Sequence, residues 1–300
     1  MKILVTGSNG LVGSYVVKQL LEEGHQVFAS SRTPDLSAFS EHPGYRFVQL
    51  DFTDPYMLDA VFEAIKPEVV VHSGAMSKPD DCEQNQSEAY TINTAGTLQL
   101  LLNAADYKSF FIFLSTDFIF NGKQGMHRED DPADPISYYG CTKLEAEEAV
   151  KTYAYEWAIV RTVFVYGKPL YGRDCFITMI AKKLRNHEAY AVTDDQERTP
   201  TYAPDLAKGI AAIIEKKATG VFHLCGKEIC SPFQMAMETA DFLGIRSHQL
   251  KPVHTADLPA LAQRPLKSGL DISKAQQQLD YAPLSLREGV RRTLEGTAGV

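Results

Sequence analysis

Several features are scarce in this sequence of 300 residues, and each scarcity disfavours a class of protein. None of its five cysteines forms a CxxC pair, so we predict neither a disulfide framework nor a zinc site. No apolar run approaches the roughly 20 residues that a membrane-spanning helix needs, and the apolar start is too short for a signal peptide. Basic residues are outnumbered, 30 Lys and Arg against 38 Asp and Glu, which disfavours a broad nucleic-acid surface. We therefore expect a cytoplasmic protein that binds neither nucleic acid nor membranes.

What the sequence does contain predicts an α/β fold. Hydrophobic residues make up 44% of the chain, which is enough for a sizeable core. In the first half, short apolar runs alternate with stretches whose apolar residues recur at helical spacing. The expected strands cover residues 3–5, 27–29, 47–50, 69–71 and 110–114. Nearly continuous apolar strands are typical of a sheet covered on both faces, so we predict a Rossmann-like, doubly wound parallel sheet.

The same pattern predicts how the chain is divided. The expected helices between the strands cover residues 11–21, 58–65 and 94–105. After about residue 165 the alternation loosens, and prolines interrupt shorter elements. We predict a dinucleotide-binding domain at residues 1–163 and a smaller, mainly substrate-binding lobe at residues 164–300, with part of residues 203–225 returning to the first domain.

A glycine-rich turn follows the first expected strand. Gly7, Gly10 and Gly13 have the spacing GxxGxxG within residues 6–13 (TGSNGLVG). Gly7 would permit a tight turn, Gly10 would let a phosphate approach the backbone, and Gly13 would let the helix pack closely on the strand. The N-terminus of the helix offers N–H groups to a pyrophosphate. Such turns can also serve chain geometry alone, but the position after an N-terminal strand favours a dinucleotide site.

The end of the second expected strand indicates which dinucleotide binds. A site that prefers NAD usually places an acidic residue about 20 residues further on, where it holds the ribose 2′-hydroxyl. Here the strand ends with Ser31 and Arg32, and the first acidic residue is Asp35. Arg32 can pair with a 2′-phosphate and Ser31 can donate to it, which favours NADPH, with NADH as the alternative cofactor. The competing interpretation is that Arg32 is an ordinary exposed loop residue.

Two further segments predict the chemistry. Ser115 and Thr116 end the fifth expected strand, where open α/β sheets bind ligands. Tyr139 and Lys143 lie four residues apart and share one face of an expected helix. An ammonium about 4 Å from the phenol would lower the tyrosine pKa by roughly three pH units at an effective dielectric constant of 20. We therefore predict a tyrosine that exchanges protons near neutral pH.

Together these motifs resemble the extended short-chain dehydrogenase/reductases, and within them the dTDP-4-dehydrorhamnose reductase family. The resemblance runs nearly end to end. It is carried by residues 114–122 (LSTDFIFNG), 129–139, 195–207 and 264–271. It implies an oxidoreductase that uses NADPH to reduce the 4-keto group of a nucleotide-linked 6-deoxy sugar, dTDP-4-dehydrorhamnose to dTDP-L-rhamnose.

The resemblance also implies roles for individual residues. Tyr139 would protonate the substrate carbonyl oxygen, Lys143 would hold the nicotinamide ribose, and Thr116 would hydrogen-bond the same carbonyl oxygen. The residues expected to contact the cofactor are Gly7, Asn9, Gly10, Leu11, Val12, Gly13, Ser31, Arg32, Asp51, Phe52, Gly74, Ala75, Met76, Tyr139 and Lys143. The residues expected to contact the substrate are Lys78, Thr116, Asp117, Phe118, Phe164, Arg198 and Arg264. Asn93 falls where many relatives support a proton-relay water, and an ordinary helix polar residue is the alternative.

Departures from the family pattern refine these expectations. Related dehydratases follow the threonine with Asp and then Glu, whereas Asp117 is followed here by Phe118, which favours carbonyl reduction over elimination. Phe118 and Phe164 stand where rhamnose-pathway reductases often carry Tyr and Trp, so the sugar or nucleotide can differ from the family's usual one. Tyr15 stands where some relatives hold a metal with an acidic residue, so we expect no such metal.

Two other functions stay open at this point. The chain can be a non-catalytic, NADP-binding regulatory subunit that resembles the β subunit of methionine adenosyltransferase, which shares many of these motifs. It can also be a nucleotide-sugar epimerase that retains its NAD, although Ser31, Arg32 and the C-terminal reductase-like segments disfavour this alternative. Beyond a nucleoside-diphosphate sugar, the only partner that we expect is a second copy of the chain, in a homodimer.

Overall fold

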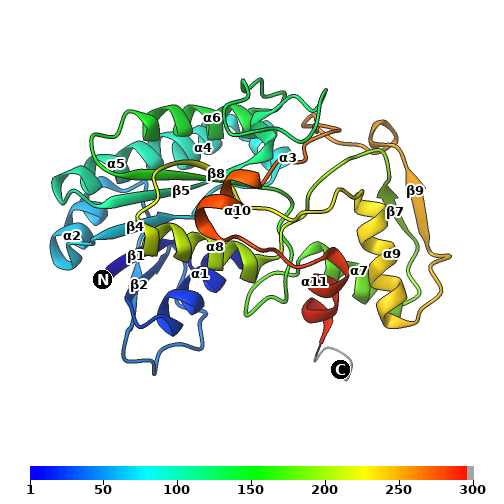
Figure 1. The fold of residues 1–300 in the computed structure, drawn as a ribbon, viewed down its shortest axis with the longest axis horizontal. Helices are drawn as coiled ribbons and strands as arrows, with labels where there is room; N and C mark the ends of the chain where they lie inside the picture. The colour runs from blue at the N-terminus through cyan, green and yellow to red at the C-terminus, as the bar shows by residue number, and fades with distance from the viewer. Residues whose placement is uncertain (296–300) are drawn as a thin grey trace.

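A parallel sheet forms the framework of the larger part of the molecule (Figure 1). The structure is a computed structural model, and it describes residues 1–295. Within these residues the sheet has seven strands in the order β3-β2-β1-β4-β5-β6-β8, and every neighbouring pair is parallel. The strands are β1 (Lys2–Thr6), β2 (Gln26–Ser31), β3 (Tyr45–Gln49), β4 (Val69–His72), β5 (Phe110–Thr116), β6 (Trp157–Thr162) and β8 (Gly220–His223).

The direction of winding reverses between β1 and β4. From β1 the chain proceeds outward through β2 to β3, returns to β4 beside β1, and then continues to β5, β6 and β8. In a sheet wound in this way, ligands bind in the crevice beyond the carboxyl ends of the strands at the point of reversal. The predicted fold class, a Rossmann-like doubly wound sheet with a smaller C-terminal part, is confirmed.

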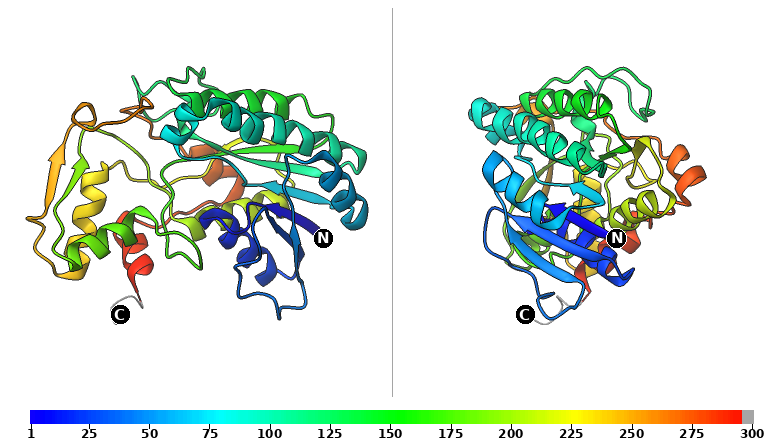
Figure 2. Two further views of the ribbon diagram at one scale, coloured as in Figure 1. Left: turned by 180° about the vertical axis from the view of Figure 1, so that it is seen from behind. Right: turned by 90° about the vertical axis from the view of Figure 1, so that its left-hand side faces the viewer.

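Helices cover both faces of the sheet (Figure 2). One face is covered by α1 (Leu11–Glu22), α8 (Ala203–Lys216) and α10 (Ser273–Leu279). The other is covered by α2 (Pro55–Ile65), α5 (Gly96–Asp106) and α6 (Tyr138–Lys151). Their apolar sides meet the centres of the strands, where Leu4, Val70 and Phe111 are completely buried. No helix in the described part of the chain is long and apolar enough to span a membrane.

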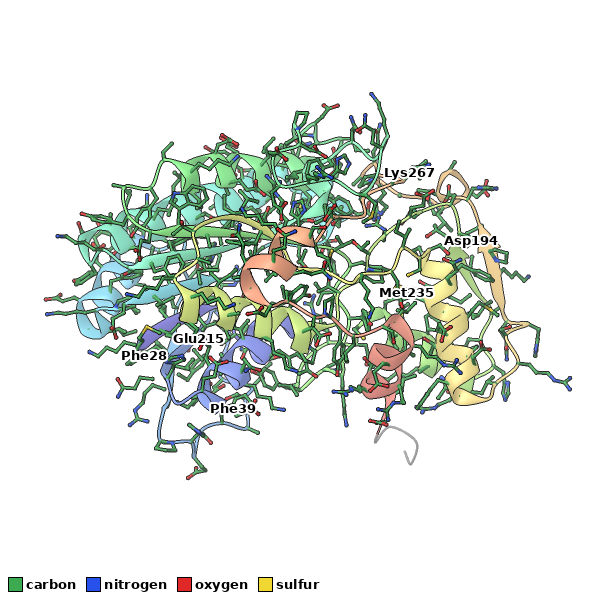
Figure 3. The ribbon with its side chains drawn as sticks, in the orientation of Figure 1. Phe28, Phe39, Asp194, Glu215, Met235 and Lys267 are labelled. Atoms are coloured by element: carbon green, nitrogen blue, oxygen red, sulfur yellow. The ribbon has the colours of Figure 1, made fainter. Side chains whose placement is uncertain are left out.

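A smaller lobe lies at one end of the sheet (Figures 1 and 2). It contains α7 (Phe176–Arg185), β7 (Tyr190–Thr193), α9 (Pro232–Leu243), β9 (Leu250–Val253), the 3-10 turn η3 (Thr255–Asp257) and α11 (Leu286–Leu294). β7 and β9 form a two-stranded parallel sheet. Asp194 and Met235 belong to this lobe, and Phe28 and Glu215 belong to the large sheet and its helices (Figure 3).

The predicted domain boundary at residues 163 and 164 stays a prediction. α8 and β8 come from the second half of the chain but belong to the large sheet, where α8 packs on α1 and β8 pairs with β6. α10 also packs on α8, so the larger unit takes more of the C-terminal half than residues 203–225. Residues 296–300 of the predicted second lobe lie outside the described residues.

The segment before α5 differs from the expected helix over residues 94–105. The chain enters it through α3 (Pro79–Gln84), α4 (Gln86–Tyr90) and a π-helical turn, η1 (Thr91–Ala95). A π turn inserts one extra residue per turn and is frequent at functional sites. It places Asn93 in the interior, where this side chain is 1% exposed. Helical periodicity in the sequence does not distinguish such a turn from the α-helix that continues it.

Candidate active site

A cleft of about 1200 Å³ opens at the carboxyl ends of the strands, between the large sheet and the smaller lobe. Many of the predicted site residues line it: Gly7, Asn9, Gly10, Leu11, Val12, Gly13, Ser31, Gly74, Ala75, Lys78, Thr116, Asp117, Phe118, Tyr139, Lys143, Phe164, Arg198 and Arg264. Four others are absent from the described lining: Arg32, Asp51, Phe52 and Met76. The crevice at the point of reversal is therefore the candidate site.

The glycine turn lies at one end of this cleft, and its close contacts require glycine. Gly7 has a φ of +70°, and a Cβ on it would lie 2.7 Å from Gly74 N. A Cβ on Gly13 would lie 2.3 Å from Gly7 O. The turn therefore packs directly against both the first turn of α1 and the segment after β4. Its backbone and the N-terminal residues of α1 line the cleft, which fits the pyrophosphate of a dinucleotide.

Asn9 ties the glycine turn to the segment after β2. Its Nδ2 donates to Thr33 Oγ1 (2.9 Å), and its Oδ1 accepts from Leu36 N (3.3 Å). Ser31, Thr33 and Leu36 line the cleft, whereas the neighbouring Arg32 is exposed. Thr33 is a candidate that the sequence analysis missed, although its hydroxyl group only two residues beyond Ser31 was a usable signal.

Two residues predicted to contact the cofactor, Asp51 and Phe52, serve the packing of the loop after β3. Asp51 Oδ1 accepts hydrogen bonds from Thr53 N (3.0 Å) and Thr53 Oγ1 (2.7 Å), which closes a turn. The Phe52 ring meets His72 edge-on at a centroid distance of 5.0 Å and also fills the space beside Gly74. Both side chains therefore make contacts within the protein, and neither is among the described residues that line the cleft.

Asn93 has no amide hydrogen to spare for a relay water. Its Nδ2 donates to Met76 O and to Thr142 Oγ1, both at 3.1 Å, and its Oδ1 accepts from Met76 N (2.8 Å). These bonds join the segment after β4 to α6. Met76, predicted to border the cofactor, is thus held by its backbone, and Asn93 acts as the connector.

Thr116, Tyr139 and Lys143 come together in the cleft because the start of α6 packs on the end of β5. Ser137 caps α6 by accepting a hydrogen bond from Gly140 N (3.2 Å). A Cβ on Gly140 would lie only 2.2 Å from Phe118 O, so glycine permits this contact. Thr116, Tyr139 and Lys143 are 6%, 8% and 2% exposed, and all three line the cleft.

Burial controls the protonation of these groups. Burial raises the pKa of Tyr139 by more than the neighbouring Thr116 hydroxyl lowers it. Burial also lowers the pKa of Lys143 to about 7, against the effect of Glu147. The prediction that Lys143 brings the pKa of Tyr139 near neutrality is therefore wrong for the protein alone, because both groups lose hydration. Tyr139 keeps its proton at neutral pH, as a proton donor must.

The substrate end of the cleft contains a buried ion pair. Arg198 Nη1 lies 3.2 Å from Asp117 Oδ2, and the two residues are 5% and 2% exposed. The Arg198 guanidinium also lies 5.4 Å from the Phe118 ring centroid and 5.7 Å from that of Phe164. One arginine thus connects the acidic residue and both aromatic residues that we predict to contact the substrate.

The other basic residues predicted to contact the substrate also have acidic partners. Arg264 donates from both terminal nitrogens to Asp80, at 3.0 and 2.7 Å. Lys78 Nζ lies 3.7 Å from Asp81 in an exposed pair, which contributes little to stability. Because Asp80 belongs to α3 and Arg264 follows η3, the Asp80–Arg264 pair bridges the two sides of the cleft.

The charge of the cleft contrasts with that of the chain. Five basic side chains line it, Lys78, Lys143, Arg173, Arg198 and Arg264, against three acidic ones, Asp80, Asp117 and Asp174, in a chain of net charge −8. A local basic excess attracts anions such as diphosphates. Arg173 was missed by the sequence analysis because it lies in an irregular loop with no motif around it.

Two further features of residues 1–295 bear on where a ligand could bind. No group of three or more His, Cys, Asp or Glu residues within residues 1–295 could hold a metal ion. Tyr15, which stands where some relatives hold a metal, donates its hydroxyl hydrogen to Lys168 O (2.6 Å).

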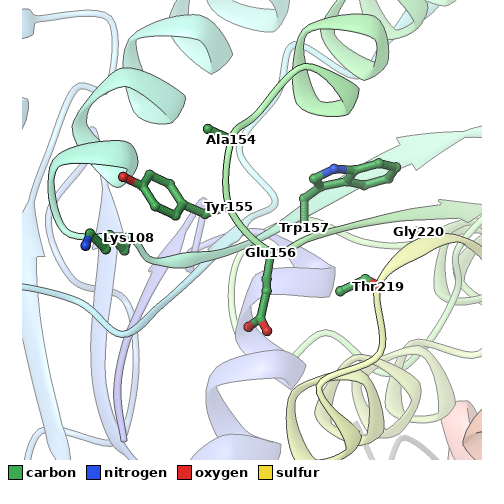
Figure 4. A pocket seen from close by; sticks show the side chains of 7 residues that line it. All are labelled: Lys108, Ala154, Tyr155, Glu156, Trp157, Thr219 and Gly220. Atoms are coloured by element: carbon green, nitrogen blue, oxygen red, sulfur yellow. The ribbon is translucent and has the colours of Figure 1, made fainter.

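A second hollow, of about 630 Å³, lies at the opposite end of the strands (Figure 4). Its lining residues are Lys108, Ala154, Tyr155, Glu156, Trp157, Thr219 and Gly220, and they contain none of the motifs described above.

Comparison with known proteins identifies the family. Residues 1–298 match the model of the RmlD substrate binding domain. The chain belongs to this family. A solved member of similar fold is the dTDP-4-dehydrorhamnose reductase of Clostridium acetobutylicum, with 30% identity, a TM-score of 0.85, and coverage of 98% of this chain and 99% of that one.

Two further relatives show the range of the RmlD family. The dTDP-4-dehydrorhamnose reductase of Bacillus anthracis, solved in complex with NADP, has 26% identity and a TM-score of 0.86, with 98% of each chain covered. The beta subunit of methionine adenosyltransferase 2 from Bos taurus is 30% identical over 301 residues, which cover 98% of this chain and 87% of that protein. Family membership therefore establishes the fold and the sugar-nucleotide reductase family. It does not decide which of these relatives has the same function as this chain.

Proposed function

We propose that this protein is an NADPH-dependent reductase that converts the 4-keto group of a nucleotide-linked 6-deoxy sugar into a hydroxyl group. The proposed substrate is dTDP-4-dehydrorhamnose, and the product is dTDP-L-rhamnose. The observation that carries the proposal is the meeting of Thr116, Tyr139 and Lys143 in one cleft, between the glycine turn and a basic substrate end. Tyr139 is the proton donor that a reductase needs, and its position in one cleft with Thr116 and Lys143 favours catalysis over binding alone.

The cleft fits the cofactor at the glycine turn, where Gly10 and the start of α1 would hold the pyrophosphate. Ser31 ends β2, and Arg32 and Thr33 follow it; together these residues would hold the 2′-phosphate. Lys143 lies 3.9 Å from the Phe113 ring centroid and would reach the nicotinamide ribose. The bound nicotinamide would supply the hydride.

The proton comes from the protein. The phenol of Tyr139 is protonated at neutral pH, and burial raises its pKa further above the usual value. It would give this proton to the carbonyl oxygen, where negative charge develops during reduction. The Thr116 hydroxyl lowers the pKa of the phenol, so this neighbour favours the phenolate that remains after the transfer. Charge on the neighbouring Asp117 opposes early loss of the proton.

At the substrate end, the sugar would lie against Phe118 and Phe164, which present apolar rings to its C–H groups. The basic side chains Lys78, Arg173 and Arg264 would attract the diphosphate. Arg264 can do so only by sharing its guanidinium with Asp80 or by leaving it, because both terminal nitrogens already donate to that carboxylate.

The test is NADPH oxidation in the presence of dTDP-4-dehydrorhamnose, followed by nicotinamide absorbance, in the wild-type protein and in Tyr139→Phe. We expect wild-type turnover and a loss of about 10²- to 10⁴-fold in the variant, which keeps the ring but lacks the proton. NADPH binding should be unchanged, since the glycine turn is untouched. Equal turnover by the two proteins would remove the proton-donor role. Absence of wild-type turnover with a panel of keto-sugar nucleotides would refute the proposed activity.

A second candidate function is regulatory binding without catalysis. Its support is the similarity to the beta subunit of methionine adenosyltransferase 2, which is as high as the similarity to the reductases. In that case the protein would bind NADPH, show no turnover with any sugar nucleotide, and form a complex with a synthetase subunit. A binding measurement against such a subunit separates the two functions.

A further inference from the structure

The loop between β6 and α7 lies against the glycine turn. The hydroxyl group of Tyr171 donates a hydrogen bond to Ser8 O (3.1 Å). A Cβ on the next residue, Gly172, would lie 3.5 Å from Asn9 O. We call residues 168–174 the strap, because they contact the same turn that would hold the pyrophosphate of a dinucleotide.

Both ends of the strap are fixed. At its start, Lys168 O accepts a hydrogen bond from the Tyr15 hydroxyl on α1 (2.6 Å). At its end, Asp174 pairs with Lys182 on α7 (2.6 Å) and accepts a hydrogen bond from Thr178 Oγ1 (3.1 Å). α1 packs on the large sheet, whereas α7 belongs to the smaller lobe. The strap therefore connects the smaller lobe with the side of the cleft where the cofactor would bind.

Arg173 lies within the strap and lines the cleft. It directly follows Gly172, which lies against Asn9 O, so its side chain starts one residue away from a contact with the glycine turn. Gly10 and Leu11 line the same cleft at the start of α1. Helix N-termini bind phosphate through backbone N–H groups, and a guanidinium matches phosphate in charge and geometry. The turn and Arg173 can therefore hold one phosphate group between them.

Arg173 differs from the other arginines of the cleft in its partners. Arg198 pairs with Asp117, and Arg264 pairs with Asp80. The acidic residue next to Arg173 in the sequence is already paired with α7. Within the part of the chain that the structure describes, no carboxylate lies at ion-pair distance from Arg173. Its guanidinium can therefore bind an anion without losing an existing partner.

We propose that Arg173 binds the pyrophosphate of the dinucleotide, and that Tyr171 is the positioning residue that holds the strap against the glycine turn. Arg173 still attracts the diphosphate of the sugar nucleotide at long range, but its contact is with the cofactor. Because the strap leads into α7, the smaller lobe then helps to bind the cofactor as well as the substrate. The inference rests on the proposed dinucleotide cofactor and does not require the proposed reduction.

Arg173→Gln tests the contact, and fluorescence titration measures it without turnover. The Kd for NADPH should rise about tenfold, because a hydrogen bond between charged groups is lost. The Kd for NADH should rise by the same factor, since both dinucleotides contain the pyrophosphate. The matched control is Arg128→Gln, which removes an exposed arginine outside the described lining of the cleft. Both Kd values should stay unchanged in the control.

Fragments of the cofactor locate the contact. 2′-Phospho-ADP-ribose contains the pyrophosphate, whereas adenosine 2′-monophosphate lacks both of its phosphate groups. In competition with NADPH, Arg173→Gln should bind the first fragment about tenfold more weakly than the wild type and the second equally well. Equal weakening of the two fragments would place Arg173 at the 2′-phosphate and overturn the assignment.

Tyr171→Phe tests the position of the strap, because it keeps the ring and removes the hydrogen bond to Ser8 O. NADPH should dissociate about two- to tenfold faster, the range for one hydrogen bond between uncharged groups, and stopped-flow displacement measures this rate. The control is Tyr155→Phe at the second hollow, where the hydroxyl group has no hydrogen bond among the described residues. A purely structural role of Tyr171 predicts a lower melting temperature with an unchanged dissociation rate.

The remaining outcomes separate this inference from the proposed function. Unchanged Kd values for NADPH and NADH in Arg173→Gln would overturn it. A rise confined to the Kd for dTDP would also overturn it, because it would place Arg173 at the diphosphate of the substrate. Absence of wild-type turnover with every sugar nucleotide would refute the reduction, and the binding results would still decide the role of Arg173. Failure of the wild type to bind either dinucleotide would overturn both.

Discussion

At the residue scale, the buried Lys143 is needed for the proposed chemistry but lowers the stability of the folded protein. It is 2% exposed, and burial lowers its pKa to about 7 from 10.5. Since the unfolded chain binds this proton more tightly than the native one, stability rises with pH between about 7 and 10.5 and is lowest below that window. One pKa unit corresponds to about 1.4 kcal/mol.

Lys143→Met should therefore stabilise the protein while abolishing turnover. We expect a gain of a few kcal/mol below about pH 7, since one pKa unit is worth about 1.4 kcal/mol, and a shrinking gain as the pH rises toward 10.5. Urea unfolding at several pH values measures it. A variant less stable than the wild type at acidic pH would mean that the buried ammonium is compensated in the native protein.

Arg32 tests the cofactor preference at the same scale. The residue is exposed at the end of β2, beside the lining residues Ser31 and Thr33. Arg32→Glu should raise the Kd for NADPH at least about tenfold, because an attraction to the 2′-phosphate becomes a repulsion, or about 1.4 kcal/mol. The Kd for NADH should hardly change. The control is Arg46→Glu, an exposed charge reversal on the neighbouring strand β3. Equal weakening of both cofactors by Arg32→Glu would place the 2′-phosphate elsewhere.

At the scale of elements, the junction of β1 and α1 depends on Gly13. A Cβ there would lie 2.3 Å from Gly7 O, so Gly13→Ala must push the helix away from the glycine turn. We expect a loss of about 1–3 kcal/mol in the free energy of unfolding, as for other overpacked sites, together with loss of NADPH binding. Denaturant unfolding and fluorescence titration measure the two effects.

The control for this prediction is Gly24→Ala. Gly24 has a φ of +78° and nothing within 4 Å of the added Cβ, so alanine is strained without a clash. It should lose about 1 kcal/mol and still bind NADPH normally. If both variants kept the cofactor, the tight contact of turn and helix would not be needed for the dinucleotide site.

Most elements of the first half could be predicted, because their apolar patterns are strong. β1, α1 and β4 follow the expected ranges within one or two residues. The π turn at residues 91–95 could not be predicted, because an inserted residue leaves helical periodicity almost unchanged. In the candidate site, the glycine turn and the Tyr139–Lys143 spacing are local and visible. The pairs Asp117–Arg198 and Asp80–Arg264 join residues 81 and 184 positions apart, and no local pattern reveals such partners.

The pKa values of the groups in the candidate site also could not be predicted from the sequence. The spacing of Tyr139 and Lys143 predicts their common helix face, but not how far burial shifts both pKa values. Desolvation depends on everything packed around a group, so it requires the assembled fold. For the same reason, the sequence does not reveal that Arg198 and Arg264 each have a carboxylate partner in the folded chain.

At the scale of the whole molecule, Asp80 connects the two sides of the cleft. Its carboxylate accepts from Leu261 N (3.2 Å), Ala262 N (3.0 Å) and both terminal nitrogens of Arg264. Asp80→Ala should expose the amides of Leu261 and Ala262, which hydrogen exchange detects as faster exchange. The KM for the sugar nucleotide should rise several-fold while the Kd for NADPH stays unchanged.

Asp81→Ala is the matched control for this connection. Asp81 is the neighbouring acidic residue, and its only described ion pair is the exposed one with Lys78 at 3.7 Å. Neither the amide exchange nor the KM should change in this variant. A normal KM in Asp80→Ala would show that the segment around residues 258–264 does not help to bind the substrate.

The proposed reduction requires hydride transfer from NADPH to the sugar. The most direct measurement uses NADPH deuterated at the nicotinamide C4 position and dTDP-4-dehydrorhamnose, with the product analysed by NMR spectroscopy and mass spectrometry. The account predicts one deuterium at sugar C4 and a new hydroxyl group there, with wild-type protein and not with Tyr139→Phe on the same time scale. Tight binding of NADPH with no deuterium in any keto-sugar nucleotide tested would contradict it and favour regulatory binding.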